Sequence, residues 1–159
     1  MAAELSNEGW SSSDFRAMCD SFSLMKKMDV ITLPSDFVDE LIARQYKADK
    51  EGLLQMFREM GSEVAGVVRI DAPSITQFAE LAKEFLGFLP LKMFDLAADE
   101  AKGVIEIKAA GVGRRIESTE CALEMLLSFL DSYGLMVTIR EIGLGTLRIL
   151  ASRNDLEIS

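Results

Sequence analysis

Residues 104–151 read VIEIKAAGVGRRIESTECALEMLLSFLDSYGLMVTIREIGLGTLRILA, and this stretch decides the fold. Short segments rich in β-branched and apolar residues predict strands at 104–110, 136–142 and 146–151. Residues 117–133 have the apolar spacing of a helix, and Gly134 predicts its end. The Gly-Leu-Gly sequence at 143–145 predicts that the last two strands form a hairpin.

The preceding segments add helices and one more strand. Apolar spacing predicts helices at 12–27, 35–48, 51–69 and 74–86, and Ser74 with Gln77 has the spacing of a capping box. A strand at 91–96 follows, joined to 104–110 by a polar turn at 98–103. Helices that precede pairs of strands favour an antiparallel sheet with its helices on one side.

We therefore expect an α+β fold, with N-terminal helices followed by a four-stranded antiparallel sheet (β-β-α-β-β) and the helices packed on one face. It should occupy residues 29–153 as a single ligand-binding-like domain. An N-terminal arm at 1–28, partly helical or disordered, should precede it, and a tail at 154–159 should follow.

Two helices carry more detailed predictions. In 117–133, a narrow polar strip (Glu120, Glu124, Ser128, Asp131) interrupts an otherwise apolar circumference, so the helix should be buried on two sides. It should lie between the sheet and either the other helices or a second copy. Gly61 is on the apolar side of 51–69, which predicts a close approach by another element.

Composition excludes several classes of function. The chain has 159 residues, a net charge of −9, two cysteines and no histidine. The missing imidazole removes the Ser-His-Asp triad, ordinary His-zinc catalysis and His-ligated haem. The negative charge disfavours nucleic-acid binding, and no apolar run approaches the roughly 20 residues that span a bilayer. With a polar start, these features predict a cytoplasmic protein without integral membrane association, disulfides, metal or cofactor.

Residues 111–115, GVGRR, lie between a predicted strand and helix, where backbone N–H groups and the helix dipole attract anions. Arg114 and Arg115 would bind such an anion, with Ser118 or Thr119 at the helix start. The complete glycine-rich phosphate motifs are missing, so a tight turn with two solvated arginines is favoured. Cys121 is interpreted as a packed thiol, because no histidine is available to activate it.

Charged residues elsewhere have simple structural explanations. The carboxylate pairs Asp39/Glu40 and Glu59/Glu63 lie on polar faces of predicted helices and should face water. Arg140 and Glu141 fall in a strand beside Arg148 of the next strand, so cross-strand ion pairing accounts for them. No complete catalytic motif is present, and the sequence leans against an enzyme.

The order of these segments resembles a known superfamily. The resemblance rests on Met60-Gly61 within a helix, LAKEFLGF at 81–88, LKMFDL at 91–96, VIEIK at 104–108, Cys121 and MVTIREI at 136–142. This order is similar to the 4-vinyl reductase domain and the predicted hydrocarbon-binding proteins, and more distantly to the TRAPP tethering subunits. The cysteine cluster and the haem-ligating histidine found in some members are missing here.

The resemblance implies a homodimer with an apolar pocket for a small hydrophobic molecule, such as a hydrocarbon or acyl chain. The residues expected to line that pocket are Phe57, Met60, Val64, Phe78, Phe85, Met125 and Phe129. On this basis the leading hypothesis is a non-catalytic regulatory module that holds such a ligand. The alternative is a scaffold-like subunit that binds another protein and no small molecule.

Overall fold

The computed structural model describes residues 33–86, 93–99 and 101–153, together with Arg16, Cys19, Phe22, Ser23 and Lys26, which are helical. The rest of the predicted arm, the tail and the side chain of Phe85 lie outside the described residues. The elements are α2 (Ser35–Ala48), α3 (Lys50–Asp71), α4 (Ile75–Leu86), β1 (Met93–Asp99), β2 (Val104–Ala110), α5 (Ile116–Asp131), β3 (Leu135–Gly143) and β4 (Thr146–Arg153).

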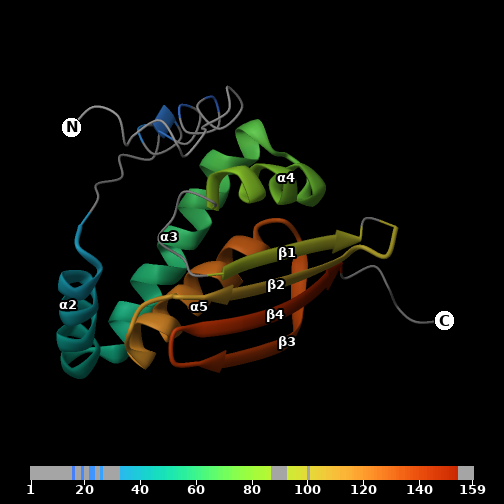
Figure 1. Cartoon of the computed structure of the whole chain (residues 1–159). Helices are drawn as coiled ribbons and strands as arrows, with labels where there is room; N and C mark the ends of the chain where they lie inside the picture. Colours follow the sequence, from blue (N-terminus) through green and yellow to red (C-terminus); the bar gives the residue numbers. More distant parts are fainter. Residues whose placement is uncertain are drawn as a thin grey trace, which may run out of the picture.

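The four strands form one sheet in the order β1-β2-β4-β3, and every neighbouring pair is antiparallel. β1 and β2 are one hairpin, and β3 and β4 are the other (Figure 1). The predicted α+β class with a four-stranded antiparallel sheet is therefore confirmed. Because β2 and β4 are central, β1 and β3 are the two edge strands.

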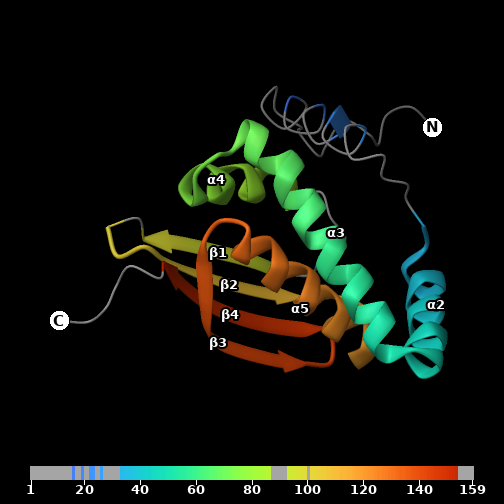
Figure 2. The ribbon, with the colours of Figure 1, turned by 180° about the vertical axis from the view of Figure 1, so that it is seen from behind.

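One face of the sheet carries the core. α5 lies on β3 and β4, α4 lies on β1, and α3 packs against α5 on the side away from the sheet. Figure 2 shows this stacking of α3, α5 and sheet from behind. The prediction that the helix at 117–133 is buried on two sides is confirmed, and its second neighbour is α3. The buried strand residues on this face are Leu96, Ile105, Ile107, Ala109, Leu135, Leu147, Ile149 and Ala151.

The opposite face of the sheet is more polar, and no described helix lies on it (Figures 1 and 2). On this face Arg148 joins two carboxylates, donating from Nε to Glu106 at 2.9 Å and from Nη1 to Glu141 at 3.3 Å. Lys108 pairs with Glu106 at 3.2 Å. The predicted cross-strand pairing is thus confirmed for Glu141 and Arg148.

Local signals in the sequence set several element boundaries. The capping box that begins α4 is confirmed in both directions: the N–H of Gln77 donates to the Ser74 hydroxyl, and the N–H of Ser74 donates to the Gln77 side chain. Gly134 has φ +71° just after α5, a conformation that favours glycine, so the predicted end of that helix is also confirmed. No helix among the described residues is long and apolar enough to cross a membrane.

The close contact between α3 and α5 is centred on Gly61, as predicted. A Cβ at this position would lie 2.9 Å from the backbone carbonyl carbon of Met125 and closer still to the carbonyl oxygen. Real Cβ atoms essentially never come that close. The missing side chain therefore sets the distance between these two helices.

Candidate functional site at the free edge of the sheet

A β-bulge in β3 determines which way its charged side chains point. Val137 pairs with Ala151 and Ile139 pairs with Leu150, so Thr138 is an extra residue in the edge strand. Beyond the bulge, Arg140 is opposite Ile149, which is fully buried on the helix-covered face. Residues directly opposite each other point to the same face, so Arg140 is directed toward α5 and away from the ion pairs of the outer face.

Arg140 lines a half-open hollow between α5 and β3. Its other lining residues are Glu120, Leu123 and Glu124 from α5 and Ile142 from β3, and its volume is about 280 Å³. Leu123 is buried, whereas Ile142 remains 41% exposed. Small-molecule pockets usually measure roughly 300–1,000 Å³, so this hollow is at the lower limit for a ligand and suits one or two side chains better.

The wall formed by α5 is held in place by a polar seam with α3. Three residues of the polar strip predicted on this helix, Glu120, Glu124 and Ser128, each form a polar contact with a side chain of α3. Lys50 Nζ is 2.9 Å from Glu120, Arg58 Nε is 2.7 Å from Glu124, and the Ser62 and Ser128 hydroxyls are 2.7 Å apart. The seam therefore ties both acidic residues of the hollow to α3.

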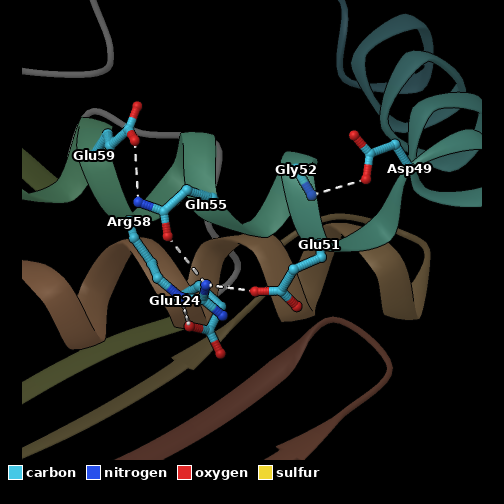
Figure 3. A network of polar contacts seen from close by, with 7 residues as sticks. All are labelled: Asp49, Glu51, Gly52, Gln55, Arg58, Glu59 and Glu124. Carbon is cyan, nitrogen blue, oxygen red and sulfur yellow. Dashed lines mark hydrogen bonds and ion pairs between the residues drawn. The ribbon is translucent and has the colours of Figure 1, made fainter.

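The Arg58 part of the seam is the more extensive. Figure 3 shows its guanidinium between the two helices, directed at Glu124 on α5 and Glu51 on α3. Gln55 also accepts a hydrogen bond from Arg58, at 3.3 Å, and donates to Glu59 at 3.0 Å. Only 34% of the Arg58 side chain is exposed, because the guanidinium lies against Glu124 of α5.

A second cluster holds Glu120. The hydroxyl of Tyr46 in α2 donates to the same carboxylate oxygen that binds Lys50, and the Lys50 ammonium lies 4.7 Å above the Tyr46 ring. The hydrogen bond from Tyr46 lowers the pKa of Glu120, while burial raises the pKa of Tyr46. At neutral pH the carboxylate is therefore charged and the phenol protonated, which suits neither for acid–base catalysis there.

The thiol of Cys121, which is next to Glu120 in the sequence, is also unreactive. Cys121 is fully buried, and burial together with the negative charge of Glu120, Glu117 and Glu124 raises its pKa to about 11. The thiol is thus protonated and inaccessible, which agrees with the predicted packed cysteine. Within the described residues, no group of three or more Cys, Asp or Glu side chains is placed to hold a metal ion.

The residues predicted to line an apolar pocket fall into different parts of the interior. Phe78 and Phe129 come together, with ring centroids 4.7 Å apart, and both also contact the Tyr133 ring. Val64 packs on the same core cluster, but Phe57 packs on a separate one around Leu53, Leu54 and Cys121. Met60 is 39% exposed, and the Met125 backbone faces Gly61. None of these six described residues lines the hollow, and the role of the predicted set in ligand binding stays a prediction.

The predicted anion-binding segment is in contact with α2. The Asp39 carboxylate accepts hydrogen bonds from the Arg114 N–H at 2.9 Å and from the Ser118 hydroxyl at 2.5 Å. Arg114 pairs with Asp36 and Arg115 with Glu40. An external anion would have to compete with these carboxylates, so binding at Arg114 and Arg115 stays a prediction.

The prediction that Asp39 faces water is wrong, because this residue is only 5% exposed. Its hydrogen-bond partners lie 75 and 79 residues later in the chain, so the polar pattern of α2 gives no indication of them. The sequence analysis likewise missed Ile142 and the inward direction of Arg140. For these two residues the necessary information is the bulge at Thr138, which has no distinctive sequence signal.

Comparisons with protein-family models, with curated proteins and with solved structures found no match to this chain.

Proposed function

We propose that the chain is a non-catalytic interaction module that binds an extended polypeptide segment along the free edge of β3, which is the side of this strand that pairs with no other described strand. The observation that carries this proposal is the hollow beside that edge, lined from both β3 and α5. Polypeptides that add a strand to a sheet gain affinity from main-chain hydrogen bonds, and pockets for alternate side chains give specificity. The edge of β3 would supply the main-chain hydrogen bonds, and the hollow would supply a pocket for side chains.

The side chains at this edge support the same proposal. Ile139 on the outer face and Ile142 on the inner face are 37% and 41% exposed, so an added strand would cover apolar surface on both sides of the sheet. Residues on an added strand would alternate between the two faces. Those facing α5 would enter the hollow next to Leu123 and Ile142.

Between the two functions considered from sequence, the geometry favours protein binding over a small hydrophobic ligand. The Phe78, Phe129 and Tyr133 rings occupy the interior beside one another, whereas the hollow at the surface is partly polar. The acidic groups of the hollow are paired with cations of α3, so they serve to hold its wall in place. These features suit recognition of a peptide better than enclosure of an acyl chain.

The proposal can be tested by selecting random seven-residue peptides displayed on phage against the folded protein. Binding of a selected, synthesised peptide should slow amide hydrogen exchange in β3 and in the first half of α5. Ile142→Ala should weaken binding, whereas Leu144→Ala, at an even more exposed aliphatic residue in the adjacent turn, should not. Failure to enrich any peptide, or protection on the α3 surface instead of β3, would exclude the edge as the binding site.

A further inference from the structure

Arg140 differs from the other charged residues that line the hollow. Glu120 and Glu124 are each joined to a cation of α3. Arg140 makes no salt bridge or side-chain hydrogen bond with any residue that the structure describes, although Arg148 on the neighbouring strand makes two. The bulge thus places one unpaired positive charge where an added strand would cover it.

That charge makes the edge selective. A strand with only apolar side chains would cover the guanidinium and displace its water without offering other hydrogen-bond acceptors. Such uncompensated desolvation of an ion costs free energy. Charged residues that point inward are one means by which edge strands prevent unwanted pairing. A strand that presents a carboxylate would pair with Arg140 and avoid this cost, so the same residue rejects one class of segment and admits another.

We infer that the hollow recognises an extended segment in which an aliphatic residue is followed two positions later by aspartate or glutamate. This inference rests on the proposed function, because it names the partner of the same edge. The aliphatic side chain packs on Ile142 and Leu123, and the carboxylate pairs with Arg140. The segment runs antiparallel to β3, as every pair in this sheet does.

The order of the two side chains follows from the strand direction. In an antiparallel pair, the residue opposite Ile142 comes two positions before the residue opposite Arg140, and both point toward α5. A parallel segment would need the reverse order, with the acid first. Direction and chemistry can therefore be tested with the same set of peptides.

The test uses fluorescein-labelled seven-residue peptides with threonine at the four outward positions and isoleucine, glutamate and alanine, in that order, at the three inward ones. Three matched peptides replace the glutamate by glutamine, replace it by lysine, or exchange the isoleucine and glutamate. Fluorescence anisotropy with the full chain should show that the first peptide binds about tenfold or more tightly than the glutamine and reversed peptides. The lysine peptide should be the weakest.

Protein variants assign this preference to Arg140. Arg140→Glu should abolish the preference for glutamate and make the lysine peptide the tightest, while Arg140→Gln should make the glutamate and glutamine peptides equal. Arg153→Glu, the same charge change on an exposed arginine at the far end of β4, should leave the preference unchanged.

The outcomes separate this inference from the function on which it rests. Peptides that bind at β3 with equal affinity whatever their charge, or that bind more tightly with lysine, overturn the inference and leave the proposed function intact. Failure of every peptide, including those from the random library, overturns the proposed function itself. A dimer in sedimentation that dissociates on Arg140→Glu would make a second copy the occupant of the edge and would also overturn the inference.

Discussion

Replacing Gly61 with alanine tests whether contact between α3 and α5 organises the fold. The new Cβ would lie 2.9 Å from the Met125 carbonyl carbon, whereas ordinary van der Waals contact begins at 3.4 Å. Because the obstructing atoms belong to the backbone of α5, no side-chain rotation can relieve the clash. Clearing the carbonyl carbon alone requires the helices to separate by about 0.5 Å, and the closer carbonyl oxygen requires more. A gap of that size already forfeits about a quarter of the dispersion energy between the facing atoms.

The expected loss can be estimated from opposing effects. Overpacking of this kind costs about 1–3 kcal/mol, and contact with backbone places Gly61→Ala at the upper end. Alanine also gains about 1 kcal/mol over glycine in a helix interior. We therefore expect a net loss of about 2 kcal/mol, which lowers the Tm of a domain of this size by about 4–8 °C.

Gly66→Ala is the matched control in the same helix. Gly66 is exposed, and a Cβ there would meet no atom within 4 Å. This variant should therefore gain about 1 kcal/mol from helix propensity alone. Urea denaturation and thermal scans of both variants measure the difference. If Gly61→Ala were as stable as the native chain, or stabilised it as Gly66→Ala should, the close contact would not set the position of α3.

Three further predictions concern buried polar and ionisable groups. Asp39→Ala should reduce the free energy of unfolding by about 2 kcal/mol or more, because it leaves two donors at the start of α5 without their acceptor. The control Asp36→Ala removes an exposed ion pair and should cost less than about 1 kcal/mol. Equal losses in urea denaturation would contradict the burial of Asp39. Iodoacetamide at pH 8 should alkylate the exposed Cys19 in the folded protein and reach Cys121 only after unfolding, which peptide mass spectrometry can show. Burial raises the pKa of the Cys121 thiol from 9.0 to about 11, so the folded state holds this proton more tightly than the unfolded state does. The contribution of this group to the free energy of unfolding is fully present below pH 9 and is lost as the pH rises toward 11. The urea midpoint should fall over that interval, and less steeply in Cys121→Ser; identical slopes would refute this assignment.

The features that sequence predicted well depend on local or one-dimensional patterns. The capping box at Ser74 and Gln77 uses residues three positions apart, and the glycine after α5 ends a helix whose apolar pattern stops there. Gly61 was informative because glycine within an apolar helix face needs a compensating contact. In each case the signal lies within one or two turns of chain, although the contact that satisfies Gly61 is made by Met125 of another helix.

The features that the sequence did not predict depend on which face of a strand a residue points to, or on partners far away in the chain. A strand without the bulge would place Arg140 on the outer face beside Arg148, which is the arrangement assumed from sequence. One extra residue, Thr138, exchanges the faces and brings Glu141 opposite Arg148 instead. Likewise, the carboxylate of Asp39 resembles those around it until α5 is placed against α2.

This exchange of faces also decides which residue can report on binding without disturbing the fold. Glu120 and Glu124 line the hollow, but they also join α5 to Lys50 and Arg58, so replacing either would loosen α3 and alter the hollow at once. A loss of affinity in those variants would not distinguish recognition from distortion. Arg140 is exposed and makes no such link among the described residues, so its replacement changes the charge of the hollow and leaves the wall in place. A reversal of peptide preference in Arg140→Glu, with an unchanged urea midpoint, is therefore evidence for direct contact.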